Sequence, residues 1–151
     1  MIIQEFTSQD QERFRCLSKE FYVGGATLRP YNEEISLKTF KRVLDHHENL
    51  WGYLFYDKEN GDAIGYALVT SYWCNEEGGE VILIDELYIS PKNRQKGYAK
   101  IFMEWLETTF KDKVAITLEV LTTNIDAKML YDKAGYQPDG FVTYTKFLRK
   151  D

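Results

Sequence analysis

The stretch EVILIDELYI, residues 80–89, constrains the fold more than any other part of the sequence. Its residues do not alternate between apolar and polar, so both sides of the strand it predicts are apolar except at Asp85 and Glu86. A strand of this kind lies inside a sheet that is covered on both faces. The stretch therefore predicts a layered α/β protein, and it places two carboxylates where burial is costly.

Segments with strand and helix periodicity alternate along the rest of the chain. Strands are predicted at residues 1–6, 50–57, 63–73, 114–120 and near 141–148, and helices at about 7–22, 33–47, 98–111 and 124–135. Ser8 and Gln11 have the spacing of a capping box for the first helix. The pair Asn60-Gly61 tolerates the positive φ of a hairpin turn. We expect a mixed α/β fold with a twisted central sheet.

Length, charge and cysteine spacing exclude several classes of protein. The 151 residues fit one domain, and no apolar run approaches the roughly 20 residues of a membrane span. The net charge of −5 argues against a general nucleic-acid binder. Cys16 and Cys74 lack the spacing of a zinc site or a disulfide framework, so no metal is expected. The first residues do not resemble a secretory signal, which predicts a cytoplasmic protein.

A basic turn, SPKNRQKGYAK, joins the buried strand to an amphipathic helix. The first turn of a helix leaves backbone N–H groups without intrahelical partners, and the helix dipole favours an anion there. Gly97 allows close approach of the backbone, and Arg94 and Lys96 add positive charge. On these residues alone, a pyrophosphate site and a solvated basic turn have comparable support. The usual P-loop and Gly-x-Gly-x-x-Gly patterns are absent from the sequence.

The arrangement Arg94-x-x-Gly97-x-Ala99 behind an apolar strand resembles the pyrophosphate loop of the GNAT superfamily of acetyl-CoA-dependent N-acetyltransferases. The stretch LYISPKNRQKGYAKIFMEWLE resembles the family's motif A, and LEVLTTNIDAKMLYDKAGYQ is similar to its motif B. Ala99 stands where many members have glycine, and upstream of about Val81 the likeness is only architectural. The resemblance implies one domain over residues 1–151, with a mostly antiparallel twisted sheet of about six to seven strands flanked by about four helices.

The resemblance also implies the residues that bind acetyl-CoA. Backbone groups of the strand before the turn would pair with the pantetheine arm and polarise the thioester carbonyl, as oxyanion donors do. Amides of the turn would hold the pyrophosphate, and motif B would add side chains. The full implied set is Leu87, Tyr88, Ile89, Arg94, Gln95, Lys96, Gly97, Tyr98, Ala99, Asn124 and Lys128. For Lys128, an exposed helix lysine is the stronger interpretation.

Three residues are candidates for the chemistry. Tyr131 matches the family's tyrosine near the cofactor sulfur, where a phenol gives a proton to the departing thiolate; a core position is the alternative. An alkyl amine with a pKa near ~10 is protonated at neutral pH, so it needs a base. Asp85 and Glu86 are the candidate bases, acting directly or through water, with Glu86 slightly favoured for its longer side chain. Neighbours in a regular strand face opposite sides, so only one faces the substrate unless a bulge intervenes.

We therefore expect an N-acetyltransferase that moves an acetyl group from acetyl-CoA to a primary amine by direct attack. A small cationic or polyamine-like acceptor fits the carboxylates near the cleft. The alternatives are a non-catalytic sensor that binds CoA or a peptide, and an acyltransferase that acts on protein lysines or N-termini. The expected partners are a small-molecule amine and, as an option, a second copy of the chain; neither nucleic acid nor a membrane is expected. Tyr22, Tyr31, Trp73, Glu76 and Glu77 are expected to flank the acceptor cleft.

Overall fold

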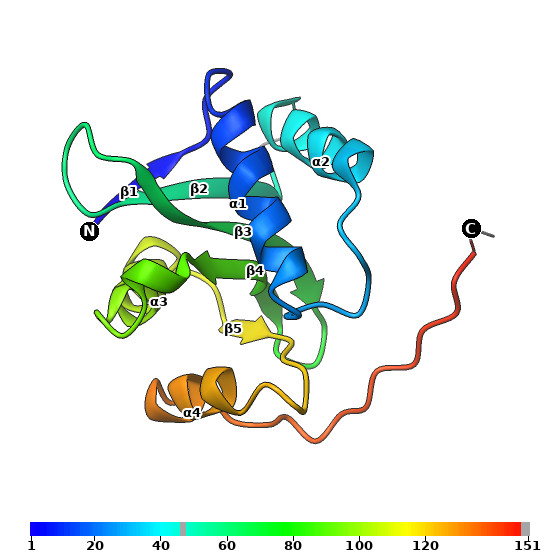
Figure 1. The fold of residues 1–151 in the computed structure, drawn as a ribbon. Coiled ribbons are helices and arrows are strands. Elements are labelled where there is room, and N and C mark those ends of the chain that lie inside the picture. Colours follow the sequence, from blue (N-terminus) through cyan, green and yellow to red (C-terminus); the bar gives the residue numbers. More distant parts are fainter. Residues whose placement is uncertain (46–47, 149–151) are drawn as a thin grey trace.

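The computed structural model describes residues 1–45 and 48–148 (Figure 1). Its sheet has the strand order β1-β2-β3-β4-β5, in which β4 and β5 are parallel and the other neighbours are antiparallel. The strands are β1 (Ile2–Glu5), β2 (Leu50–Tyr56), β3 (Ala63–Cys74), β4 (Gly79–Ile89) and β5 (Ala115–Leu118). The predicted α/β architecture is confirmed. In the described residues no helix is both long and apolar enough to cross a bilayer.

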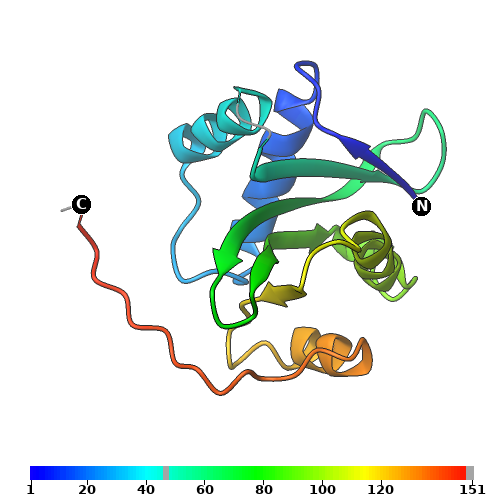
Figure 2. The ribbon, with the colours of Figure 1, turned by 180° about the vertical axis from the view of Figure 1, so that it is seen from behind.

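Helices cover both faces of the sheet (Figures 1 and 2). They are α1 (Gln11–Val23), α2 (Glu33–Asp45), α3 (Tyr98–Thr109) and α4 (Ile125–Lys133), with a short 3-10 turn at Pro91–Asn93. Neighbouring residues of β2 face opposite sides of the sheet. Phe55 packs with α3, whereas Leu54 packs with α1 and α2. Both are fully buried, and each such side chain stabilises the fold by about 1.5–3 kcal/mol.

The α1 side of the sheet is filled with aromatic rings. Phe14 of α1 lies 5.2 Å from Tyr66 of β3 and 5.9 Å from Phe40 of α2, measured between ring centroids. Phe6 lies 5.0 Å from Phe14 and 5.5 Å from Phe40. Aromatic pairs at these separations add to the gain from burial. The position of α1 over β3 and β4 is therefore well defined, and this matters because α1 supplies part of the site.

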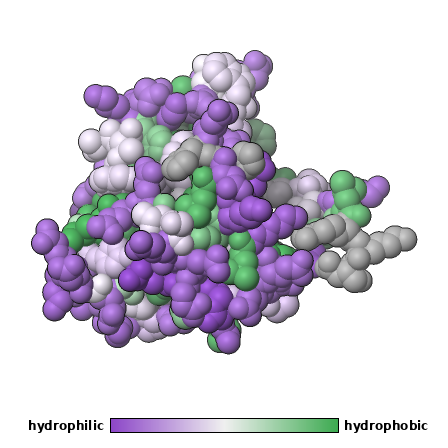
Figure 3. Space-filling model, turned by 90° about the horizontal axis from the view of Figure 1, so that it is seen from above, coloured by the Kyte–Doolittle hydropathy of each residue, from purple (hydrophilic) through white to green (hydrophobic). Residues whose placement is uncertain are grey.

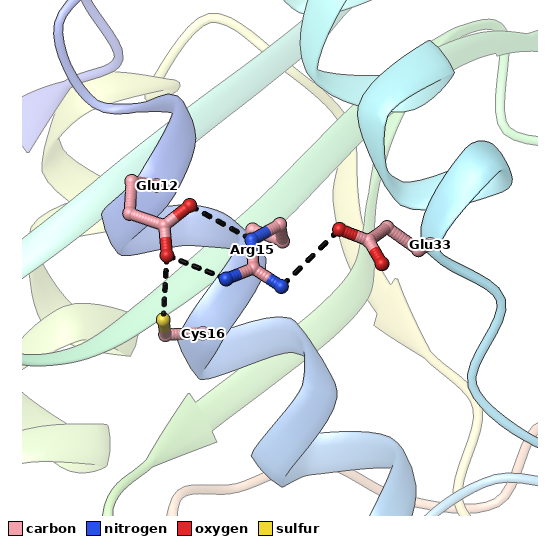
Figure 4. Close-up of polar contacts among 4 residues, drawn as sticks. All are labelled: Glu12, Arg15, Cys16 and Glu33. Atoms are coloured by element: carbon pink, nitrogen blue, oxygen red, sulfur yellow. Dashed lines mark hydrogen bonds and ion pairs between the residues drawn. The ribbon is translucent and has the colours of Figure 1, made fainter.

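An ion-pair cluster joins α1 to the start of α2 (Figure 4). Arg15 donates to Glu12 within α1, and its Nη1 lies 3.2 Å from Glu33 Oε1 in α2. The hydrogen bond from Arg15, followed by that from Cys16, lowers the pKa of Glu12 to about 2. Because exposed pairs contribute little free energy, the packing of Phe14 against Phe40 holds the two helices together more than this cluster does.

Of three details predicted from the sequence, one is wrong, one lies partly outside the described residues and one agrees with the structure. The predicted capping box is wrong, because α1 begins at Gln11 after Asp10, whose carboxylate accepts from Thr7 N at 2.8 Å and Thr7 Oγ1 at 2.7 Å. The second helix ends at Asp45, and the predicted residues 46–47 lie outside the described part of the chain. In the hairpin turn Asn60 has a φ of 56°, which is the positive φ that the sequence predicted.

The predicted closing strand near residues 141–148 does not form, which is why the described sheet has fewer strands than expected. This segment runs away from the body of the protein (Figure 1). Its large apolar side chains are exposed, namely Phe141, Val142, Tyr144, Phe147 and Leu148. Hydrophilic residues cover most of the face seen in Figure 3, with a hydrophobic patch on the part that projects to one side. The sequence pattern is that of a strand, but within the described chain no strand pairs with it.

Candidate active site

Strand β4 contains a bulge at Asp85. Leu68 of β3 pairs with Glu86 and the next residue, Val69, pairs with Ile84, so the β3 register skips Asp85. A bulge of this kind shifts the alternation of side chains along the strand by one residue. The bulge that the sequence analysis left open is therefore present, and its extra residue is Asp85, one of the two candidate bases.

The shift in alternation turns Glu86 toward α1. Ile84, before the bulge, and Leu87, after it, both pack in the cluster under α3. They are three residues apart, whereas residues of a regular strand that share a face are two or four apart. Tyr88, two residues after Glu86, packs in the cluster under α1. Glu86 itself hydrogen-bonds Tyr66, which belongs to the same cluster. In a regular strand Glu86 would have faced the core under α3.

Two tyrosine hydroxyls donate to Glu86, one to each carboxylate oxygen. Tyr22 Oη lies 2.7 Å from Oε1, and Tyr66 Oη lies 2.6 Å from Oε2. Burial raises the pKa of Glu86, while the hydrogen bonds from Tyr66 and Tyr22 lower it. The net pKa lies above the ordinary value, so Glu86 titrates closer to neutrality than a solvated glutamate.

The surroundings of Asp85 differ from those of Glu86. Asp85 is exposed, and no described side chain hydrogen-bonds to it. Partial burial by the surrounding protein raises the pKa of Asp85, and the negative charge of Glu119 raises it further. Glu119 directly follows β5, whose pairing with β4 ends at Ile84 and Leu118. The two carboxylates thus lie where β4 and β5 separate.

The separation of β4 from β5 leaves main-chain groups of β4 free on one edge. Leu87, Tyr88 and Ile89 pair with β3 on the other edge, and β5 does not reach them. The carbonyl of Ile89 is occupied, because Arg94 Nε donates to it at 2.9 Å. This free edge belongs to the strand whose backbone the sequence analysis expected to pair with the pantetheine arm.

The turn before α3 presents a group of unpaired amides. Gln95 and Gly97 have φ angles of 61° and 79°, and Gly97 is the N-cap of α3. Within the described chain no acceptor is bound to the backbone N–H groups of residues 95–100, whereas the next amide, that of Ile101, donates to Gly97 O at 3.0 Å. Successive free amides at a helix N-terminus form an anion-binding concavity.

The two cations of this turn are held by the protein itself. Arg94 donates to the strand end, and its guanidinium lies 5.7 Å from the centroid of the Tyr88 ring. Lys96 Nζ lies 3.3 Å from Asn93 Oδ1, and the Asn93 amide in turn donates to Ser90 Oγ at 2.9 Å. The free donors of this turn are therefore mostly main-chain amides, with Arg94 at their edge.

A cavity of about 800 Å³ connects these parts. It is lined by Tyr131 and by most of the predicted cofactor residues. The predicted cofactor residues among its lining are Leu87, Tyr88, Ile89, Arg94, Gln95, Gly97, Tyr98, Ala99 and Asn124. Lys96 and Lys128 do not line it, and neither do the two candidate bases, which lie beside it on β4. A volume of this order suits an elongated cofactor arm.

Tyr131 extends from α4 and is partly buried against the cluster under α3. Its ring centroid lies 6.1 Å from that of Tyr136, and no described group hydrogen-bonds its hydroxyl. Burial raises the pKa of Tyr131, so its hydroxyl stays protonated at neutral pH. It therefore carries a proton at neutral pH in a position beside the cavity.

Asn124 is the N-cap of α4, and its Oδ1 accepts from Ala127 N at 3.2 Å. Capping is thus one function of this side chain, and its amide group remains beside the cavity. Lys128 is exposed on α4. In the described residues no group of three or more His, Cys, Asp or Glu side chains is arranged to hold a metal ion.

The sequence analysis missed several residues that the fold brings to the site. Phe21, Gly24 and Gly25, at the end of α1, line the cavity opposite β4. Tyr66 donates to Glu86, and Glu119 acts on Asp85. Tyr66 carried a signal, because a tyrosine on the buried side of a strand needs a hydrogen-bond partner. The others depend on contacts between distant segments, which local sequence does not reveal.

Two comparisons relate the chain to known acetyltransferases. A model of the acetyltransferase (GNAT) family matches residues 11–136. The D-amino-acid N-acetyltransferase HPA3 of Saccharomyces cerevisiae is 28% identical over 141 residues, covering 92% of this chain and 86% of that protein.

Solved structures share the fold. A possible acetyltransferase from Clostridium difficile 630 superposes with a TM-score of 0.82 at 16% identity, covering 99% of this chain and 98% of that one. The aminoglycoside acetyltransferase AAC(6')-Iy, in complex with a bisubstrate analogue, superposes with a TM-score of 0.79 at 18% identity over 97% of each chain. At these identities the likeness shows the fold alone.

Proposed function

The chain belongs to the GNAT acetyltransferase family and is an enzyme that uses acetyl-CoA, and on this premise we propose that it acetylates a primary amine by direct attack on the thioester. The observation that carries the proposal is the run of free amides at the N-terminus of α3, which opens onto the cavity beside the candidate bases and Tyr131. Family membership disfavours the sensor alternative. We propose that residues 1–151 act as one acetyltransferase domain, and the cytoplasmic location stays a prediction.

The residues beside the cavity fit CoA. Free amides between Gln95 and Ala99 would hold the pyrophosphate, with Arg94 at the edge of the site. The free edge of β4 at Leu87 and Tyr88 would pair with the pantetheine arm and donate to the carbonyl oxygen as charge develops there. Bound CoA supplies the activated acetyl group; these groups of the chain place it.

Proton transfers complete the reaction. The amine nitrogen bonds to the carbonyl carbon while its proton passes to Glu86 or Asp85, directly or through water. As the carbon–sulfur bond breaks, the Tyr131 hydroxyl gives its proton to the leaving thiolate. The raised pKa of both carboxylates brings their titration closer to that of the amine, which favours the transfer.

The acceptor is proposed from charge. The charge of Glu119 acts on Asp85 and that of Asp85 acts on Glu86, so three carboxylates lie near the point where β4 and β5 separate, and a small cationic amine is favoured. The name of the yeast relative adds D-amino acids as a second class of acceptor. Peptides with free lysines or N-termini test the third class, acetylation of proteins.

The test measures CoA release with acetyl-CoA over a panel of polyamines, D- and L-amino acids and peptides. Tyr131→Phe should lower kcat by about 10²–10⁴-fold with the best acceptor, because the thiolate loses its proton donor. Tyr72→Phe, which changes an exposed tyrosine of β3, is the matched control. Silence of the wild-type protein over the whole panel would argue against the proposed reaction, and equal rates for the two variants would remove Tyr131 from it.

A second copy of the chain is the proposed protein partner. The exposed apolar side chains of residues 141–148 support it, since such groups are unfavourable in water. Light scattering coupled to gel filtration reads out the mass directly, and a monomer at all concentrations would contradict it.

A further inference from the structure

We propose that Tyr22 and Tyr66 are positioning residues, which hold Glu86 as a fixed, ionised carboxylate and so make it the group that takes the proton from the amine. The structure shows one hydroxyl on each oxygen, at 2.7 and 2.6 Å. These lengths are typical of charge-assisted O–H···O⁻ hydrogen bonds. The inference rests on the acetyl transfer proposed above and assigns the base between two adjacent carboxylates.

The two donors come from different elements and are themselves held. Tyr66 of β3 is fully buried, and its ring packs edge-on against Phe14 of α1, with 5.2 Å between the ring centroids. Tyr22 lies near the C-terminal end of α1, with its ring edge-on to Phe21 at 5.5 Å and to Tyr31 at 6.1 Å. Glu86 is therefore fixed from two directions by packed side chains, as a preorganised catalytic group needs to be.

The hydroxyls matter because burial works against the charge of Glu86. The titratable groups that act on Glu86 are Tyr22 from α1, Tyr66 from β3 and Asp85 from β4 itself. Burial and the charge of Asp85 raise the pKa of Glu86, whereas the two hydroxyls lower it. Burial and the neighbouring carboxylate also raise the pKa of both tyrosines, so they stay protonated and remain donors.

Asp85 lacks such support. It is exposed at the bulge, and among the described side chains none hydrogen-bonds to it. An unsupported carboxylate samples several rotamers, and a loosely held group is a poor base in a concerted transfer. The transfer itself is balanced: the nitrogen–carbon bond forms as the N–H proton moves to a Glu86 oxygen, and neither tyrosine gives up its proton.

The first experiment is a pH profile of kcat/KM for wild type and Tyr22→Phe. Loss of the hydroxyl raises the pKa of Glu86, so the acidic arm of the profile should move to higher pH. Relative to wild type, the variant should lose about tenfold more activity on the acidic arm than on the alkaline plateau. Tyr66→Phe should shift the arm in the same direction. Tyr53→Phe, a buried tyrosine under α3, is the matched control and should leave the arm in place.

A second readout does not depend on activity. NMR titration of carboxyl-labelled glutamate, with Glu86→Gln to assign the signal, should show a higher pKa for Glu86 in Tyr22→Phe than in wild type. In the Glu86→Gln background, Tyr22→Phe should cause no further shift of the acidic arm, because it acts through Glu86.

The outcomes separate this proposal from the proposed function. An inactive wild-type protein would contradict acetyl transfer and would overturn the assignment of the base with it. An active protein whose acidic arm does not move in Tyr22→Phe would overturn the positioning proposal alone. An NMR shift of Glu86 without a kinetic shift would also overturn it, because Glu86 would then be held by the tyrosines without being the base.

Discussion

The turn before α3 and the α1-facing side of β4 both serve the proposed reaction, but they are built differently. The turn offers main-chain amides from one continuous stretch, with Gly97 at the helix N-cap. The side of β4 offers a carboxylate held by tyrosines 64 and 20 residues away in sequence. The comparison teaches that a site can be local at its cofactor end and depend on the whole fold at its acceptor end.

The largest effect should come from the acceptor end. Glu86→Gln should lower kcat/KM by about 10²–10⁴-fold, because the base is lost, and Asp85→Asn should lower it much less. Since the charge of Asp85 raises the pKa of Glu86, Asp85→Asn should also move the acidic arm of the profile to lower pH. Steady-state kinetics from acid to neutral pH checks both. The assignment is wrong if Asp85→Asn is the more damaging change.

The raised pKa of Glu86 also predicts that this ionised carboxylate lowers the stability of the fold at neutral pH. The folded pKa of Glu86 lies above its unfolded value, so the folded state binds the proton more readily. Stability from this group therefore rises as pH falls through the raised folded pKa toward the ordinary pKa of glutamate. Glu86→Gln should remove this dependence and raise the melting temperature at neutral pH, which thermal unfolding measures.

A smaller loss is expected at the cofactor end from Gly97→Asp. A side chain at a φ of 79° is strained, and the new carboxylate would repel the pyrophosphate, so affinity for CoA should fall roughly 10- to 100-fold. Gly78→Asp is the matched control, because Gly78 has a φ of 70° and, as at Gly97, a Cβ added there would meet open space. Calorimetry with CoA should separate them; equal affinities would contradict the anion site.

The smallest effect should come from Asn124→Ala. Loss of the cap on α4 should cost about 1 kcal/mol of stability, with only a modest loss of CoA affinity. Asn75→Ala, in the exposed turn between β3 and β4, is the control. Chemical denaturation gives the free energy of unfolding for each. A large loss of CoA affinity at unchanged stability would show that Asn124 contacts the cofactor rather than capping.

Local sequence was enough to predict the free amides before α3, whereas the cofactor assigned to them stays a prediction. The apolar strand, Gly97 and the amphipathic helix follow one another directly, so spacing alone predicted where unpaired amides would gather. Most strands and helices were also predicted from local sequence, because the periodicity of their apolar residues matches the faces that they bury in the fold. Residues 141–148 show the limit, since a strand-like pattern does not supply a neighbour to pair with.

The acceptor end could be predicted only in part. The two carboxylates were visible as the polar residues of β4, but their orientation depends on the bulge opposite Leu68 and Val69. The tyrosine partners of Glu86 depend on how α1 lies across the sheet, which is set by aromatic packing over long sequence distances. A pattern of single residues carries no information on such contacts.

The bulge at Asp85 also bears on how this strand tolerates changes in length. Removing Asp85 would restore regular alternation and leave Glu86 facing α1, because Ile84 and Leu87 on either side of it would still face the cluster under α3. Removing a residue elsewhere in β4 would instead turn apolar side chains away from the cores that they fill. Relatives of this chain should therefore vary in length only at position 85 or in the turns on either side of β4, and an alignment gap elsewhere inside the strand would be a sign of misalignment.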